Sequence, residues 1–323
     1  MTKEELIDLI FESDIFKKWH FFDYHFSFYK NDDEHPLAKS IVDAILNIES
    51  KIPKAGLDYL TKIANINSKE KSTQHYDQLL QVLAELTIIS HAVEFDWNDL
   101  KKLEYEPISL SSKKNPEIAI TTNTLKMAIE VKAPEFVKKH NERADNPTQL
   151  PSRSKLINKV DKSLTTLPRD NVVKDFLISA NSKFEGFKAD DLTTYCVLVI
   201  VWDDFVYEPI SAISSPQAGL FTANTFAKTE SGEQMKFEHV DCIIITRHLF
   251  PIKCATRDEV LPDLSQHPLD YGREGEFPFK IMIPNPESDL PIPQEMVDCF
   301  QTLELSQDLG AEYSPIDIIN WIE

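Results

Sequence analysis

The stretch NPEIAITTNTLKMAIEVKAPEF, residues 115–136, has the pattern of a β-hairpin that carries charged residues at fixed positions. Two apolar segments flank Asn123, which suits a turn because asparagine tolerates a left-handed backbone. A two-residue loop at Asn123 and Thr124 determines which residues face each other across the strands: Ile120 and Met127, Ala119 and Ala128, Ile118 and Ile129, and Glu117 and Glu130.

Period-two alternation divides this hairpin into an apolar face and a charged face. The apolar face consists of Ile118, Ile120, Met127, Ile129 and Val131, and the charged face of Glu117, Ala119, Ala128, Glu130 and Lys132. The Cβ atoms of Glu117 and Glu130 are therefore expected roughly 4.5–5.5 Å apart. Two carboxylates about 4 Å apart repel by about 1 kcal/mol in water and by about 4 kcal/mol at an effective dielectric constant of about 20.

A proton, a basic neighbour or a divalent cation would relieve this repulsion. Carboxylate oxygens are hard ligands that suit Mg²⁺ or Mn²⁺. The facing pair therefore predicts a metal site. The alternative is an exposed charged face on which Lys132 alone offsets the repulsion.

The residues Pro116-Glu117, followed by Glu130-Val131-Lys132, resemble the PD-(D/E)xK motif of the restriction-endonuclease-like nuclease superfamily. In that family an acidic residue opens one hairpin strand, and the next strand carries acid-x-lysine. The resemblance covers roughly residues 73–206 and implies an α/β fold with a mixed central β-sheet flanked by helices. The first acid of the family is usually aspartate, so Glu117 departs from the pattern by one methylene.

The resemblance implies a role for each motif residue. Glu117 and Glu130 would hold one or two Mg²⁺ (or Mn²⁺) ions, with help from the Val131 carbonyl. Lys132 would orient the attacking water or help to deprotonate it.

Helices are expected on both sides of the hairpin in the sequence. Residues 73–91 have helical apolar periodicity, and Glu85 lies at the edge of the apolar stripe, where the family often has a further glutamate near the metal. Residues 152–164 predict a second helix with a Ser152 cap. One side of that helix carries three lysines: Lys155, Lys159 and Lys162. They would either contact the phosphates of a nucleic-acid backbone or be solvated.

The remaining chain divides into three predicted regions. Residues 1–72 form a mainly helical N-terminal region, residues 73–250 the nuclease-like core, and residues 251–323 a proline-rich C-terminal extension packed on the core. Expected helices span residues 2–18, 36–49 and 54–66. The aromatic stretch 19–30 alternates like a strand, and three nearby histidines are taken as structural because their spacing matches no familiar metal motif: His20, His25 and His35.

Two unbroken apolar runs, residues 194–202 and 240–246, predict central strands covered on both faces. Residues 279–283 predict a short strand, and residues 295–305 a helix.

Composition narrows the possible function classes. The sequence of 323 residues has a formal net charge of -19, but the charge is uneven. Between Lys101 and Lys188 it has 14 Lys and 3 Arg against 11 Asp and Glu. This block is locally basic, as a nucleic-acid partner requires, and both ends are acidic. Four scattered cysteines, no apolar run of membrane length and no signal-peptide pattern predict a soluble, reduced, cytoplasmic protein.

The expected function is metal-dependent hydrolysis of phosphodiester bonds. DNA is the expected substrate because it is the usual substrate in this family, and RNA is the alternative. A restriction or host-defence role is common in relatives of this type. The alternatives are a catalytically inactive module of the same fold that binds nucleic acid or protein, an acidic nucleic-acid mimic, or an autoinhibitory acidic cover. The acidic terminal regions would also suit a homodimer or a protein partner. With seven glycines and no P-loop, GxGxxG or GxSxG motif, nucleotide-binding and serine-hydrolase folds are not indicated.

Overall fold

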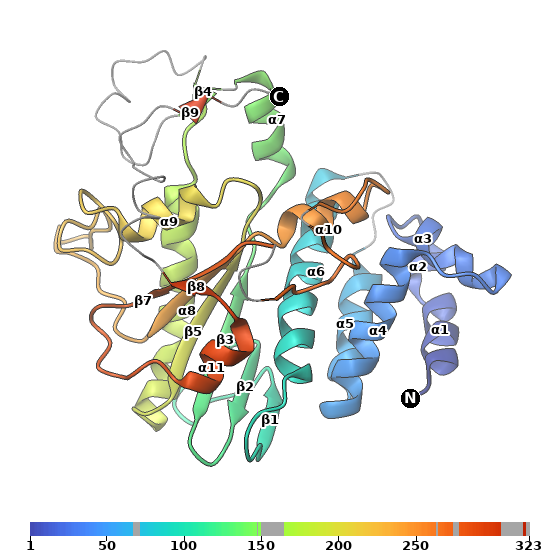
Figure 1. Cartoon of the computed structure of the whole chain (residues 1–323), viewed down its shortest axis with the longest axis horizontal. Helices are drawn as coiled ribbons and strands as arrows, with labels where there is room; N and C mark the ends of the chain where they lie inside the picture. Colours follow the sequence, from blue (N-terminus) through green and yellow to red (C-terminus); the bar gives the residue numbers. More distant parts are fainter. Residues whose placement is uncertain are drawn as a thin grey trace.

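A seven-stranded mixed sheet forms the centre of the fold (Figure 1). The computed structural model describes residues 1–66, 72–146, 148–149, 165–262, 264–273, 278–304 and 319–320. The strands occur in the order β1-β2-β3-β5-β6-β7-β8: β1 (Lys102–Tyr105), β2 (Ile118–Thr121), β3 (Lys126–Lys132), β5 (Tyr195–Val201), β6 (Cys242–Thr246), β7 (Lys280–Pro284) and β8 (Leu303–Glu304). A separate short pair joins β4 (Thr148–Gln149) to β9 (Ile319–Asn320).

Strand directions change twice across the sheet. The strands β1, β2 and β3 form an antiparallel meander, and β5 and β6 then run parallel to β3. Strand β7 is antiparallel to β6, and β8 is parallel to β7. The predicted α/β class with a mixed sheet is confirmed, as are the strands expected at residues 194–202, 240–246 and 279–283.

Helices cover both faces of the sheet (Figure 1). One face packs on the N-terminal helices α4 (Pro36–Lys51), α5 (Ala55–Asn65) and α6 (Thr73–Glu94), and the other on α8 (Asp170–Asp190) and α9 (Tyr207–Ser214). Successive residues of β5 alternate between the two layers: Val197 and Val199 join the core with α4–α6, and Leu198 and Ile200 the core with α8. Every residue of β5 is therefore buried, which explains its unbroken apolar sequence.

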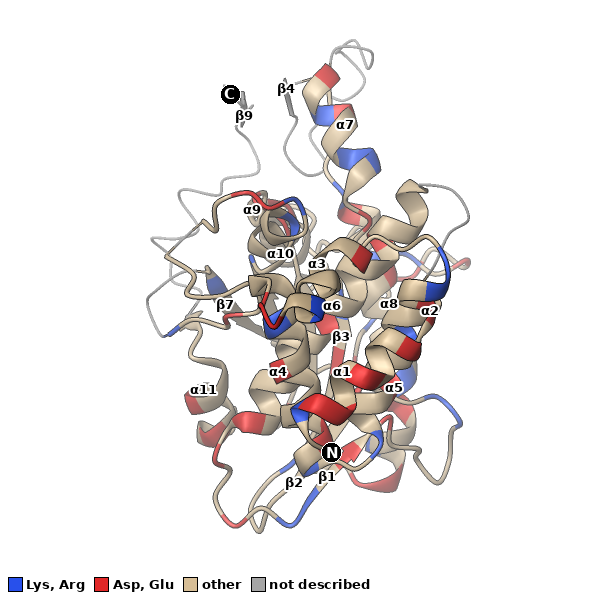
Figure 2. Cartoon of the chain, turned by 90° about the vertical axis from the view of Figure 1, so that its right-hand side faces the viewer, with Lys and Arg blue, Asp and Glu red and all other residues tan. Residues whose placement is uncertain are grey.

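The remaining helices lie around this three-layer arrangement. α7 (Val137–Asp145) follows β3, and α10 (Leu249–Ala255) packs against α6. α11 (Gln294–Phe300) precedes β8 and is shorter than the helix expected at residues 295–305. Figure 2 shows acidic residues on α11, whereas α7 carries both basic and acidic residues.

The N-terminal region is helical, but its first thirty residues differ from prediction. The helix expected at residues 2–18 is divided into α1 (Lys3–Glu12) and α2 (Asp14–Lys17), because the Ser13 hydroxyl accepts a hydrogen bond from the Ile15 N–H and caps the second helix. The strand expected at residues 19–30 is wrong.

The aromatic stretch instead forms α3 (Asp23–Ser27) and the 3₁₀ turn η1 (Phe28–Asn31). Phe22 and Phe26 are both fully buried, and their spacing of four residues places them on one helical face. The dense aromatic composition imitates strand alternation although the stretch is helical.

Helix α8 was not predicted. It connects β3 to β5 and packs through Val173, Leu177, Ala180 and Phe184 on the sheet. The helix expected at residues 152–164, with Lys155, Lys159 and Lys162, lies outside the described residues. Within the described part of the chain, none of the helices combines the length and apolar character needed to span a membrane.

Candidate active site

The hairpin register is the predicted one up to its last pair. Ile118 pairs with Ile129, Ala119 with Ala128, and Ile120 with Met127. The regular ladder ends there, because the Glu117 N–H donates to the Ile129 carbonyl at 3.0 Å. The expected Glu117–Glu130 pair is therefore replaced by a backbone bond displaced by one residue. The two side chains nevertheless meet at a third residue.

The third residue is Lys183, which lies on α8. Its Nζ is 2.7 Å from Glu130 Oε1 and 3.7 Å from Glu117 Oε1, so one ammonium bridges both carboxylates. Lys132 Nζ approaches the same Glu130 oxygen at 2.5 Å. Glu130 is fully buried and Glu117 nearly so, whereas about a quarter of each lysine side chain remains exposed. The two buried acids thus share the Lys183 ammonium, and Glu130 has Lys132 as a second cation.

Glu85 approaches this group from α6, on the other side of the sheet. The Tyr59 hydroxyl donates to Glu85 Oε1 at 2.7 Å, and Lys62 Nζ lies 3.4 Å from the same oxygen. Lys62 also donates to the Tyr105 hydroxyl at 2.6 Å and lies 2.9 Å from Glu106 Oε1. The N-terminal helices therefore hold the carboxylate of Glu85.

The electrostatics of Glu117 show how closely these acids are placed. Burial, followed by the negative charges of Glu85 and Glu130, raises the pKa of Glu117 to about 8, against the opposing effects of Lys183 and Lys62. At Lys183 burial disfavours the charged form, but the carboxylates of Glu130, Glu117 and Glu85 together outweigh burial and raise the lysine pKa. The sequence predicted repulsion between Glu117 and Glu130, and Glu85 adds to it.

Glu117→Gln is expected to stabilise the metal-free protein at alkaline pH. The folded-state pKa of Glu117 lies above its ordinary value of 4.5, so the wild type loses stability relative to the variant as pH rises from about 4.5 to about 8. Above pH 8 the variant should be more stable by on the order of 2 kcal/mol, since the lost Lys183 contact offsets part of the gain. Urea unfolding in EDTA from pH 4 to 9 measures this difference. A constant difference over that range contradicts the prediction, and Glu185→Gln, an exposed site on α8, is the matched control.

The donor set suits a hard divalent cation held by few protein ligands. Mg²⁺ usually keeps several waters and is bound through one or two carboxylates. Glu117 and Glu130 supply two such groups, and their shared ammonium shows that a cation is stabilised between them. Among the described residues, however, Glu85, Glu117 and Glu130 do not bring three ligand oxygens within 4.8 Å of one another. A cation here would rest on Glu117 and Glu130, with Glu85 farther away.

The other predicted residues are placed as follows. Val131 lies in β3 between Glu130 and Lys132, with its side chain in the core beneath the N-terminal helices. Lys155, Lys159 and Lys162 lie outside the described residues. Lys183 was missed because α8 itself was missed. Its signal was present in the spacing of Val173, Leu177, Ala180 and Phe184, with a lysine beside the last of them.

A buried ionic network anchors α8 beyond the carboxyl end of β5. Arg169, the residue before α8, donates from Nη2 to Asp203 at 2.9 and 2.8 Å and to Glu208 at 2.7 Å. Arg143 of α7 reaches Glu208 Oε1 at 2.8 Å. All four side chains are at most 8% exposed. Burial opposes the charge on Asp203, but the guanidiniums of Arg169 and Arg143 hold its pKa below the ordinary value.

Comparisons with protein-family models, with curated proteins and with solved structures found no match to this chain.

Proposed function

We propose that the chain is a metal-dependent nuclease that hydrolyses phosphodiester bonds in DNA. The convergence of two buried carboxylates, Glu117 and Glu130, on one ammonium beside an acid-x-lysine strand carries this proposal. The order of elements also supports it. A helix, a three-stranded meander, a crossover helix and a parallel strand occur in the chain order α6-β1-β2-β3-α8-β5, with α7 and β4 between β3 and α8, and this order is compatible with a restriction-endonuclease-like core.

In this proposal Glu117, Glu130 and the Val131 carbonyl hold Mg²⁺ or Mn²⁺. The bound ion would lower the pKa of a coordinated water and stabilise negative charge on the phosphate. Lys132 Nζ, held by Glu130, is a cation for the attacked phosphate and a donor that orients the water. Lys183 keeps the two carboxylates together until the ion binds.

Glu85 has a positioning role through charge rather than direct ligation. Its negative charge raises the pKa of Glu117, which favours exchange of a proton for a metal cation. Tyr59 and Lys62 fix its carboxylate from the N-terminal helices, so this region is part of the site in the folded protein.

Cleavage of supercoiled plasmid DNA by the purified full chain tests the proposal. Nicked or linear product is expected with Mg²⁺ or Mn²⁺ and none with EDTA. A single-stranded RNA substrate in parallel distinguishes DNA from RNA cleavage. Binding of DNA that weakens with salt, without product under any metal condition, would overturn the nuclease proposal.

One observation favours a second candidate, a module of the same fold that binds nucleic acid or a protein without cleaving it. Each of the three glutamates already lies beside a lysine, Lys62, Lys132 or Lys183, before any metal binds. The extra methylene of Glu117 relative to the usual aspartate agrees with this alternative. A restriction or defence role is a proposal that rests on the resemblance. A partner that docks on the acidic terminal regions is a proposal that rests on their charge.

Lys183→Met separates these candidates. If Lys183 holds the position of a metal cation, its removal should tighten Mg²⁺ binding roughly fivefold to tenfold, because a partly exposed ion pair is worth on the order of 1 kcal/mol. Isothermal titration measures the affinity, and Lys174→Met on the same helix is the control. Absence of Mg²⁺ binding in both wild type and Lys183→Met, with the variant less stable, would favour the inactive module.

A further inference from the structure

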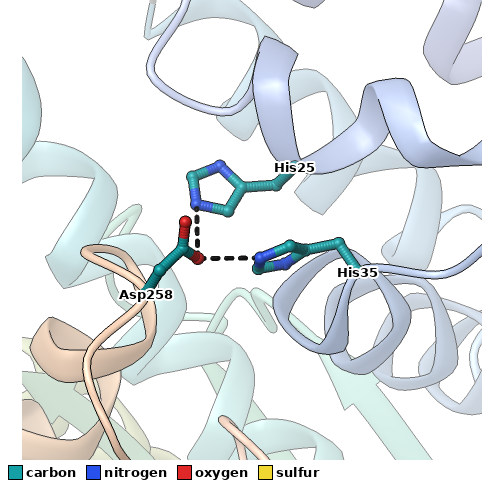
Figure 3. A group of neighbouring side chains, drawn as sticks. All are labelled: His25, His35 and Asp258. Atoms are coloured by element: carbon teal, nitrogen blue, oxygen red, sulfur yellow. Dashed lines mark hydrogen bonds and ion pairs between the residues drawn. The ribbon is translucent and has the colours of Figure 1, made fainter.

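Three side chains far from the candidate active site in sequence converge at the N-terminal helices (Figure 3). His25 lies on α3, His35 is the residue before α4, and Asp258 lies in the turn after α10. Asp258 Oδ1 is 2.8 Å from His35 Nε2 and 3.8 Å from His25 Nε2. Among the described residues this is the one group of three or more His, Cys, Asp or Glu whose ligand atoms converge closely enough to hold a metal ion.

The donor chemistry differs from that of the glutamate site. Two imidazoles and one carboxylate suit Zn²⁺ or a similar transition-metal ion, whereas Mg²⁺ prefers oxygen ligands. A tetrahedral Zn²⁺ with bonds of about 2.0–2.1 Å places its ligand atoms roughly 3.3 Å apart, and the observed 2.8 and 3.8 Å lie on either side of that spacing. Both histidines are buried, but 45% of the Asp258 side chain is exposed, which leaves room for water as a fourth ligand.

The backbone at Asp258 has a left-handed conformation. Asp258 has a positive φ of 56°, in the left-handed region that glycine or asparagine adopts more readily at the end of a helix. The chain places an aspartate there, and the carboxylate contacts both histidines. Conformations of this kind often occur where a side chain is needed in a fixed place.

We propose that His25, His35 and Asp258 form a Zn²⁺-type metal site that fastens the N-terminal helices to the turn after α10. His35 and Asp258 are 223 positions apart in sequence, so a shared ion would close a very long loop. The site is independent of the proposed nuclease function, because none of its ligands belongs to the Glu117–Glu130 group.

The two ring nitrogens of His35 determine which hydrogen bonds must break when a metal ion binds. Its Nδ1 accepts the Leu37 N–H at 3.2 Å and caps α4, so the ring proton resides on Nε2 and is donated to Asp258. A metal on Nε2 displaces that proton, and the neutral ring then carries it on Nδ1. Binding therefore breaks the capping bond and the His35–Asp258 bond and forms metal–ligand bonds to His35, Asp258 and His25, without net release of a proton from the His35 ring.

Two conservative variants remove ligands without removing local structure. Asp258→Asn keeps a residue that tolerates the left-handed backbone but removes the carboxylate charge. His35→Asn keeps a favourable N-cap for α4 but removes Nε2. The full chain, stripped of metal with a chelator, is titrated with Zn²⁺ and separately with Mg²⁺, and bound metal and melting temperature are measured.

The wild type should bind one Zn²⁺ at this site with a rise in melting temperature that Mg²⁺ does not reproduce. Each variant should lower the Zn²⁺ affinity by at least about tenfold to a hundredfold. Glu117→Gln should leave the Zn²⁺ effect unchanged, which separates the two sites. If a variant fails to fold, Co²⁺ added to the wild type provides a second measurement, with a tetrahedral visible absorption band expected. Equal Zn²⁺ affinity in wild type and Asp258→Asn, or no tetrahedral Co²⁺ band in the wild type, would overturn the proposal.

Discussion

Glu130→Gln is expected to lower the rate of Mg²⁺-dependent DNA cleavage by on the order of 10²–10³-fold, the loss typical when one preorganised electrostatic contact is removed from an active site. Glutamine keeps the shape of the side chain but removes the charge that holds Lys132 at 2.5 Å and Lys183 at 2.7 Å. It also removes one of the two carboxylates proposed to bind the metal. Single-turnover cleavage of plasmid DNA at saturating Mg²⁺ measures the effect.

Glu185→Gln on α8 is the matched control, because Glu185 is exposed and lies two residues from Lys183. Its cleavage rate should remain within about twofold of wild type, because substitutions of exposed residues outside the active site have small effects. Circular dichroism and melting temperature establish that Glu130→Gln is folded. Wild-type activity in a folded Glu130→Gln protein would remove Glu130 from the proposed chemistry.

Arg169→Met is expected to produce the largest loss of stability, about 3–5 kcal/mol in the free energy of unfolding. Methionine fills much of the volume but removes the Arg169 guanidinium from Asp203 and Glu208, which stay buried in contact with Arg143. It also loses the stacking of the guanidinium on Trp202, whose ring centre lies 4.1 Å away. Thermal unfolding should show a lower melting temperature, by roughly 10 °C.

The effect of Arg169→Met should depend on pH in a defined direction. The pKa of Asp203 is held below its ordinary value of 3.8, so the network stabilises the wild type above about that pH and the contribution is lost as pH falls further. The difference between wild type and variant should therefore shrink in acid. Lys174→Met on α8, a partly exposed ion pair with Asp175, should cost less than about 1 kcal/mol. Equal effects of the two substitutions would show that the Arg169 network does not stabilise the fold.

The hairpin was predictable because its information is local. Alternation and one turn residue gave the pairs Ile118–Ile129, Ala119–Ala128 and Ile120–Met127, and the apolar side indeed faces the N-terminal helices. The final pair was not predictable, since the shift at Glu117 arises where the ladder ends. The long runs at β5 and β6 were also recognisable, because a strand buried on both faces needs an unbroken apolar sequence.

Contacts between distant segments could not be read from one sequence. Lys183 meets Glu130 only because α8 crosses the sheet above β3, and α8 itself is interrupted by polar and small residues that hide its stripe. His25 and His35 matched no local metal spacing because their third partner, Asp258, comes from another part of the chain. Tertiary structure brought both groups together.

Anomalous diffraction from a crystal of the full chain soaked in Mn²⁺ shows whether Glu117 and Glu130 bind a divalent cation. We predict an anomalous peak within about 2.3 Å of carboxylate oxygens from both residues, in place of the Lys183 ammonium. An anomalous map with no peak between Glu117 and Glu130, from a crystal soaked at a Mn²⁺ concentration that saturates any other site on the molecule, would contradict metal binding by this pair.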